Sequence, residues 1–104
     1  MRSRKIIYIA GPITGVPEYQ RPFNAAEKEL TAAGYGVINP ARLPPELPNE
    51  KAMPICFAML AAADAVLLLP GSTTSSGALL ERGYAQYLGI PTTTNIAELK
   101  EVAR

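Results

Sequence analysis

The stretch Lys5-Ile-Ile-Tyr-Ile-Ala-Gly-Pro-Ile-Thr-Gly15 decides the fold, because a nearly continuous apolar run leads directly into a glycine-bearing turn. Apolar runs that contain β-branched residues are typical of a strand buried on both faces. We therefore expect Lys5–Ala10 to be a strand of a sheet covered by helices on both sides, with the turn at its carboxyl end.

Strands and helices alternate along the rest of the chain. Proline at the favoured first position and apolar periodicity predict helices, and short apolar runs predict strands. The expected helices are Pro22–Ala33, Met53–Ala63, a segment that follows the Ser72–Gly77 loop and ends at Leu88, and Ile96–Val102 after an Asn95 cap; the further strands are Tyr35–Asn39, Ala65–Leu69 and Ile90–Thr94. This order predicts one α/β domain over residues 1–104, doubly wound and flavodoxin-like or Rossmann-like. We expect a mainly parallel sheet of four or five strands with helices on both faces.

Composition excludes several classes of function. The 104 residues are 48% apolar and carry a formal net charge of +1, which gives no electrostatic footprint for polymeric nucleic acid or a membrane surface. No apolar stretch is long enough to span a bilayer. Cys56 is the only cysteine, so no intrachain disulfide can form, and a reducing, cytoplasmic location is the simplest expectation.

Two segments predict more than a plain monomeric domain. Met53–Ala63 has no polar face, and a short chain can hardly bury such a helix on all sides, so we expect a homodimer or a higher homo-oligomer. Pro40–Glu50 holds four prolines and is expected to be irregular, serving as a lid or a spacer.

Glu81 is the unusual member of its helix. Its neighbours at helical spacing are apolar, whereas Arg82 and Gln86 mark the opposite face, so the pattern directs a carboxylate inward. The chain has no histidine and one cysteine, which leaves acid, base and nucleophile roles to carboxylates, tyrosine or Cys56 and predicts no metal site and no cofactor. Glu81 is a candidate catalytic residue, or else a structural acid that meets local amide donors.

Two turns, residues 11–15 and 71–77, each follow a strand at the edge of the sheet where ligands bind in such folds. Their backbone N–H groups and hydroxyls can contact an anion, although glycine and proline also mark ordinary tight turns. Tyr8 lies just before the first turn, either as a core residue or with its hydroxyl near a ligand. We expect the turns and Glu81 to converge on one pocket for carbohydrate or phosphate; the candidate binding residues are Gly11, Pro12, Ile13, Thr14, Gly15, Ser75 and Gly77.

Several motifs together resemble one known family. They are Tyr8-Ile-Ala-Gly-Pro12, Asn39-Pro-Ala41, Asp64-Ala-Val-Leu-Leu-Leu-Pro-Gly71, and Ser75-Ser-Gly-Ala78 with Glu81 and Ala85. This set looks like the nucleoside 2-deoxyribosyltransferase superfamily over nearly the whole chain. It is most similar to the small phage and bacterial branch of unassigned function, and is similar also to nucleoside 5'-monophosphate N-glycosidases.

The resemblance implies a reaction. Glu81 matches the glutamate that attacks the anomeric carbon and expels the base, and Tyr8 matches a tyrosine that supports this nucleophile. Water then completes hydrolysis, whereas a second base completes transfer. Ser75 matches a position where transferases carry an aspartate and monophosphate glycosidases carry a serine. This resemblance favours a nucleotide over a nucleoside as the small-molecule partner. The first turn also resembles the phosphate-holding turn of the glycosidases, with Thr14 at a position where they can carry a basic residue.

Cys56 departs from the family pattern. It matches the position of the second acid, which handles the proton of the leaving base, and a thiol is a weak donor there. Cys56 is therefore a catalytic candidate or a small buried hydrophobe. The expected function is a nucleotide N-glycosidase; a nucleoside 2-deoxyribosyltransferase and a non-catalytic nucleotide-binding protein are the alternatives.

Overall fold

The computed structural model describes residues 4–103, and they form a four-stranded parallel sheet in the order β2-β1-β3-β4. The strands are β1 (Ile6–Ala10), β2 (Gly36–Ile38), β3 (Ala65–Leu68) and β4 (Thr92–Thr93). In the register, Ile7 lies beside Val37 on β2 and beside Ala65 on β3. The strand β1 is therefore central and pairs on both edges.

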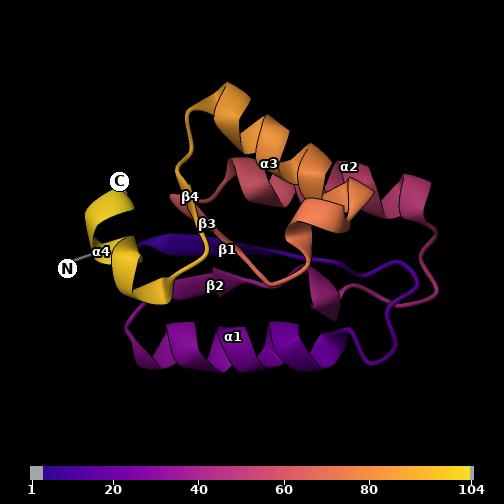
Figure 1. Cartoon of the computed structure of the whole chain (residues 1–104), viewed down its shortest axis with the longest axis horizontal. Coiled ribbons are helices and arrows are strands. Elements are labelled where there is room, and N and C mark those ends of the chain that lie inside the picture. The colour runs from indigo at the N-terminus through magenta and orange to yellow at the C-terminus, as the bar shows by residue number, and fades with distance from the viewer. Residues whose placement is uncertain (1–3, 104) are drawn as a thin grey trace.

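Helices cover both faces of this sheet, which confirms the doubly wound α/β fold (Figure 1). The helix α1 (Gln20–Ala32) and the short α4 (Leu99–Val102) pack on one face, while α2 (Asn49–Ala61) and α3 (Ser76–Leu88) pack together on the other.

Alternation along β1 divides the core into two layers. Ile7 and Ile9 point toward α1, where Phe23 and Leu30 are fully buried. Tyr8 and Ala10 point toward α2 and α3. Every residue from Ile7 to Ala10 is fully buried, as expected of a strand covered on both sides.

The direction of winding reverses at β1, and this reversal locates the candidate site. The chain passes from β1 to β2 on one side, then crosses to β3 on the other. In doubly wound sheets, ligands bind beyond the carboxyl ends of the strands at such a switch point. The segments that follow β1 and β3 are the two turns singled out in the sequence.

Two helices begin earlier than the prolines suggested. The helix α1 starts at Gln20, so Pro22 is its third residue, where the backbone N–H has no helical partner to lose. The helix α2 starts at Asn49 rather than at Met53, which places Pro54 inside it. Pro54 gives up one helical hydrogen bond, and apolar packing of α2 on the sheet offsets that loss.

The segment expected to be irregular is shorter than predicted. Residues Pro40–Arg42 form a 3₁₀ turn, η1, and Asn49 and Glu50 belong to α2, so only residues 43–48 lack regular structure.

Other boundaries shift as well. The strands β2 and β4 are shorter than expected, and residues Ile96–Glu98 form a 3₁₀ turn before α4. Asn95 caps that turn by accepting a hydrogen bond from the Ala97 N–H at 2.9 Å. Ala33 lies outside α1 and is exposed, because the chain turns away at Gly34, where φ is +96°.

Several large apolar side chains of α2 and α3 are exposed within the single chain. Only Cys56 and Leu60 of α2 are buried, and Ile55, Leu80 and Tyr87 are 40%, 59% and 85% exposed. Homo-oligomer formation stays a prediction. Within residues 4–103, no helix combines the length and hydropathy that crossing a bilayer requires.

Candidate active site

Glu81 is buried on the inner face of α3, as its helical spacing predicted. Its side chain is 5% exposed, and its carboxylate Oε2 accepts a hydrogen bond from the Tyr8 hydroxyl on β1. Burial raises the pKa of Glu81 from 4.5 to about 7, and the Tyr8 hydrogen bond opposes that rise. The carboxyl group is therefore poised between its neutral and charged forms near neutral pH.

Tyr8 contacts this carboxylate from the side that faces the core, away from the cavity. Its side chain is fully buried and does not line the cavity beside Glu81. Burial, and then the Glu81 charge, raise the pKa of Tyr8 far above its ordinary value of 10. The phenol consequently stays protonated and donates to Glu81 at any physiological pH.

Cys56 joins the same buried cluster from α2. The thiol is 6% exposed and packs in the layer that contains Tyr8. Burial raises its pKa above the ordinary value of 9, so the thiol is protonated at neutral pH. A protonated thiol is a poor nucleophile and holds one transferable proton.

A pocket of about 850 Å³ opens in front of Glu81 and Cys56. Every residue proposed from the sequence for ligand binding lines it; they are Gly11, Pro12, Ile13, Thr14, Gly15, Ser75 and Gly77. The two turns and the inward glutamate thus meet in one cavity at the carboxyl ends of β1 and β3. Tyr8 is the one proposed site residue that reaches the pocket only through another side chain.

The first turn needs glycine for two separate reasons. A Cβ on Gly11 would lie 3.0 Å from the Leu69 Cβ and 3.1 Å from the Phe23 ring, so the backbone can pass only without a side chain. Gly15 has φ of +74°, a conformation that L side chains rarely adopt. Both requirements hold the turn close over the sheet edge.

Ser75 has a local structural role at the start of α3. Its Oγ accepts a hydrogen bond from the Ala78 N–H at 3.3 Å and so caps the helix. Because the hydroxyl accepts in this contact, its own hydrogen is still available to a ligand.

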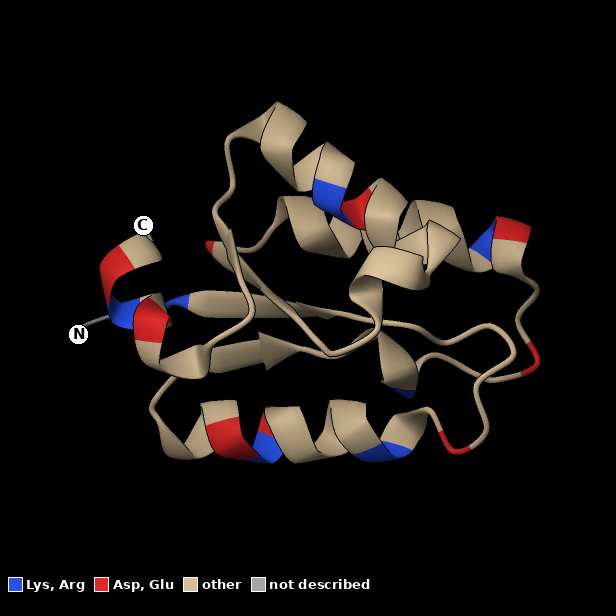
Figure 2. Ribbon diagram, viewed as in Figure 1, with Lys and Arg blue, Asp and Glu red and all other residues tan. Residues whose placement is uncertain are grey.

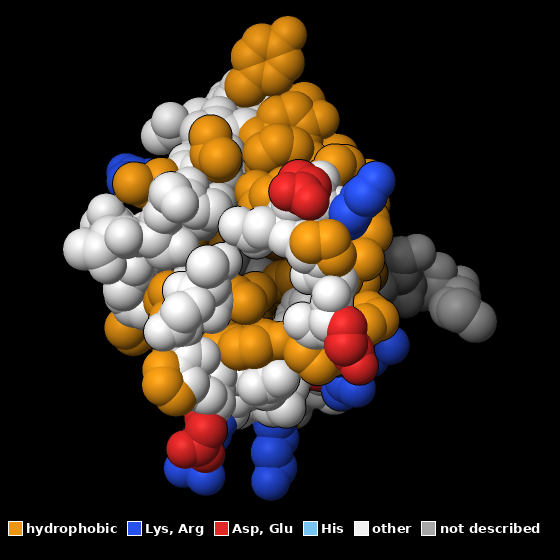
Figure 3. Space-filling view, turned by 90° about the vertical axis from the view of Figure 1, so that its right-hand side faces the viewer, with side chains coloured by type: hydrophobic (Ala, Val, Ile, Leu, Met, Phe, Trp, Pro, Cys, Tyr) orange, Lys and Arg blue, Asp and Glu red, His pale blue; other side chains and the backbone are white. Residues whose placement is uncertain are grey.

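The pocket holds no lysine or arginine among the residues that the structure describes. Figure 3 views this side and shows a hollow lined by hydrophobic and uncharged side chains, with charged side chains around its outer edge. Charged residues are frequent on α1 and α4 and sparse on α2 and α3 (Figure 2). A bound anion would therefore depend on backbone N–H groups and hydroxyls. Over residues 4–103, no group of three or more His, Cys, Asp or Glu could hold a metal ion.

Sequence reasoning missed the outer wall of the pocket. Residues Leu43–Pro45 and Leu47 line it together with Asn49, Ala52 and Met53 from the start of α2. The four prolines were a correct signal of an unusual segment, but the residues that face the cavity follow only from the path of the chain. Tyr19, just before α1, was also missed.

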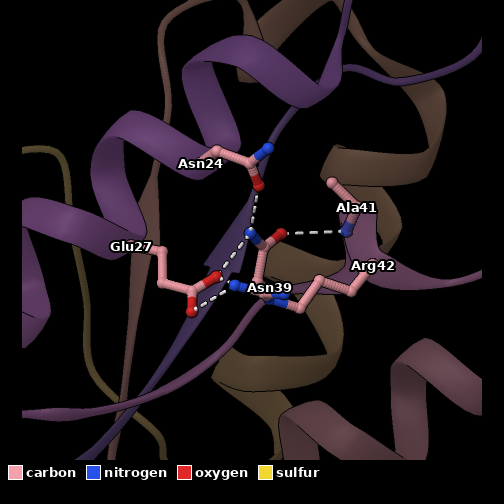
Figure 4. Close-up of polar contacts among 5 residues, drawn as sticks. All are labelled: Asn24, Glu27, Asn39, Ala41 and Arg42. Atoms are coloured by element: carbon pink, nitrogen blue, oxygen red, sulfur yellow. Dashed lines mark hydrogen bonds and ion pairs between the residues drawn. The ribbon is translucent and has the colours of Figure 1, made fainter.

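A polar cluster that the sequence did not reveal anchors this wall (Figure 4). The Asn39 amide donates to Asn24 at 3.1 Å and to Glu27 at 2.9 Å, and its Oδ1 accepts from the Ala41 N–H at 2.9 Å. Arg42 binds Glu27 through two contacts of 2.9 Å and, with Asn39, lowers the pKa of Glu27. These contacts hold η1 against α1, so Pro40 lies at a fixed position in the pocket wall.

Asp64 also has a structural partner. Its Oδ2 accepts a hydrogen bond of 2.7 Å from the Ile6 N–H at the start of β1, far from the pocket. Asp64 therefore supports the start of β1 and not the pocket.

Comparisons with known proteins identify a family and a similar solved structure. None of the curated proteins matches the chain. The solution structure of BlsM is similar to this chain with a TM-score of 0.67 and 20% sequence identity, over 99% of this chain and 78% of BlsM, which shows a shared fold. A family model described as a domain of unknown function, DUF4406, matches residues 5–94. Since that match spans most of the 104 residues, the chain belongs to the DUF4406 family.

Proposed function

We propose that this protein is an N-glycosidase that cleaves the base–sugar bond of a (deoxy)nucleoside 5'-monophosphate, with Glu81 as the nucleophile. The observation that carries the proposal is a buried carboxylate facing an 850 Å³ pocket, supported from behind by a tyrosine that cannot ionise. The resemblance of the motifs to the nucleoside 2-deoxyribosyltransferase superfamily supports the same assignment.

The proposed reaction has two steps. A Glu81 carboxylate oxygen bonds to the anomeric carbon as the bond from that carbon to the base nitrogen breaks, and the base leaves with the bonding electrons and takes up a proton. Water then attacks the anomeric carbon, loses a proton and releases the Glu81 carboxylate. Tyr8 donates a hydrogen bond to the Glu81 carboxyl group, which stabilises the carboxylate that departs in the second step.

Two features bear on how substrate and proton are handled. The 5'-phosphate would contact Thr14, Ser75 and the backbone of the first turn, because no lysine or arginine of residues 4–103 lines the cavity. The Cys56 thiol is protonated at neutral pH and is the candidate donor to the leaving base. Since a thiol is a weak acid, we expect slow turnover. Nucleotides whose base is a good leaving group should be cleaved fastest.

Product analysis tests the proposal directly. Purified protein is incubated with a panel of deoxynucleoside and ribonucleoside 5'-monophosphates, and free base is separated by chromatography. Free base should form with the intact protein and with a Glu29→Gln control, whose altered side chain is exposed on α1, and should be absent with Glu81→Gln. If Glu81→Gln released as much free base as the intact protein, the assignment of Glu81 as the nucleophile would be refuted.

The pH profile gives a second measure of the same proposal. Only the Glu81 carboxylate can attack, so the single-turnover rate should rise about tenfold per pH unit below pH 7 and level off above it. A rate that is flat between pH 5 and 8 would argue against attack by a group with this pKa.

A non-catalytic nucleotide-binding protein is the second candidate, favoured by the thiol at the position where the resembling family carries an acid. In that case nucleotide would protect the protein against heat without releasing base. Transfer is distinguished from hydrolysis by adding a second free base, because only a transferase would form a new nucleotide with it.

A further inference from the structure

Tyr19 is the only aromatic residue among the described residues that line the pocket. Its side chain is half-buried and packs against the core layer that contains Phe23, which fixes the ring at the start of α1. The remaining surface is therefore presented to the cavity by a rigid part of the fold.

The backbone just before Tyr19 is strained. Tyr19 directly precedes α1 with helical dihedral angles and no side-chain capping bond, so the chain changes direction at the residue before it. Glu18 before it has φ of +52°, the only left-handed conformation of a non-glycine residue in the described chain. Strained backbone of this kind clusters at binding and catalytic sites, where it orients a neighbouring side chain.

The pocket extends from Glu81 to Tyr19 across the edge of the sheet. Glu81 enters from α3 on one face, whereas Tyr19 begins α1 on the other face (Figure 1). A ligand that brings a sugar carbon to Glu81 has room for a second group toward Tyr19, where apolar side chains such as Leu43 and Ile13 also line the wall. Aromatic and apolar walls suit a flat, uncharged ring.

We propose that Tyr19 is the platform on which the planar heterocyclic base of the substrate stacks. This inference rests on the proposed function and deepens it, since it assigns the leaving group to one wall of the pocket. Stacking of a base on an aromatic side chain typically corresponds to about fivefold to 150-fold in affinity. Every base has a π face, so this contact favours bases over smaller or non-planar leaving groups.

Binding measurements in a Glu81→Gln background, which prevents turnover, test the platform. The probes are the deoxynucleoside 5'-monophosphates and base-free deoxyribose 5-phosphate, measured by calorimetry. Tyr19→Leu should weaken the best-bound nucleotide about fivefold to 150-fold and leave deoxyribose 5-phosphate within about twofold. Tyr19→Phe should keep most of the affinity, because it keeps the ring.

Tyr35→Leu is the matched control. Tyr35 packs against the same core layer but does not line the pocket, so its loss should leave both affinities unchanged. Equal weakening of nucleotide and deoxyribose 5-phosphate by Tyr19→Leu, or no weakening of either, would overturn the platform while the proposed function stands. Failure of every nucleotide to bind would refute the proposed function and the platform together.

A spectroscopic variant keeps the test decisive if Tyr19→Leu does not fold. The chain contains no tryptophan, so Tyr19→Trp introduces a single indole. Nucleotide should quench its fluorescence, whereas deoxyribose 5-phosphate should not. In a Tyr35→Trp control, nucleotide should not quench the indole. If nucleotide binds to the Tyr19→Trp variant without quenching its fluorescence, the proposal is overturned.

Discussion

Replacing Glu81 with glutamine should remove most of the pH dependence of stability between pH 5 and 8. In the folded protein the pKa of Glu81 is raised from 4.5 to about 7, so between these values the folded chain holds a proton that the unfolded chain has released. The stability that depends on the Glu81 proton is therefore fully present below pH 4.5 and is lost as pH rises through 7. One pKa unit corresponds to about 1.4 kcal/mol, so the full loss is about 3 kcal/mol.

Cys56, Tyr8 and Glu27 titrate outside this window. Burial raises the pKa values of Cys56 and Tyr8 above their ordinary values of 9 and 10, so both stay protonated up to pH 8. The pKa of Glu27 is lowered from 4.5 by Arg42 and Asn39, so its titration lies below pH 5. The difference in stability between the wild type and Glu81→Gln from pH 5 to 8 therefore reports on Glu81 rather than on Cys56, Tyr8 or Glu27.

Urea unfolding followed by far-UV circular dichroism at pH 5, 6, 7 and 8 measures the effect. The wild-type free energy of unfolding should fall by about 3 kcal/mol over this range, and Glu81→Gln should change little, because a neutral amide has no proton to lose and can still accept from Tyr8. Exposed Glu29→Gln should follow the wild type. A Glu81→Gln variant with the wild-type slope would refute the reasoning.

Three further predictions follow from individual contacts. Tyr8→Phe removes the hydrogen bond that lowers the pKa of Glu81, so the pH at which stability is lost should move above 7; an unchanged pH midpoint in the urea series would contradict this. Asn39→Ala leaves the Ala41 N–H without its partner and should lower the free energy of unfolding by about 1 to 3 kcal/mol in urea titrations. An unchanged free energy of unfolding would show that the Asn39 cluster is dispensable. Leu80→Glu combined with Tyr87→Glu places charge on the exposed α3 surface and should yield monomers in sedimentation equilibrium, whereas we expect the wild type to sediment as a homo-oligomer; a monomeric wild type would refute that expectation.

The fold was predictable because local patterns and tertiary structure agree over most of the chain. The apolar run of β1 is buried on both faces, and the helical spacing around Glu81 correctly predicted an inward carboxylate. Alternating strands and helices then restricted the topology, since parallel strands need crossovers and ligands bind at their carboxyl ends. The two turns could be assigned to one edge for that reason alone.

Helix boundaries and the outer pocket wall were not predictable in the same way. Proline at position 54 suggested a helix start, yet packing against the sheet stabilises a helix that contains it. The contacts of Asn39 with Glu27 join residues 12 positions apart, and no periodicity in either segment indicates them. Tyr19 was missed because its exposure to the cavity depends on the left-handed residue before it, and Glu gives no sign of that conformation.

The positions of unfavourable local features, such as a buried carboxylate or a strained backbone, help to decide whether Glu81 is functional or a structural accident. Much of the chain is locally consistent, with glycine in the left-handed conformation where α3 ends and an asparagine cap before α4, although Pro54 lies inside α2. Two costs lie at one cavity: the desolvated Glu81 carboxylate faces it, and the left-handed Glu18 lies between two residues that line it. If these costs were accidents, they would have no reason to share a cavity. Their coincidence favours selection for a ligand that contacts both ends of the pocket.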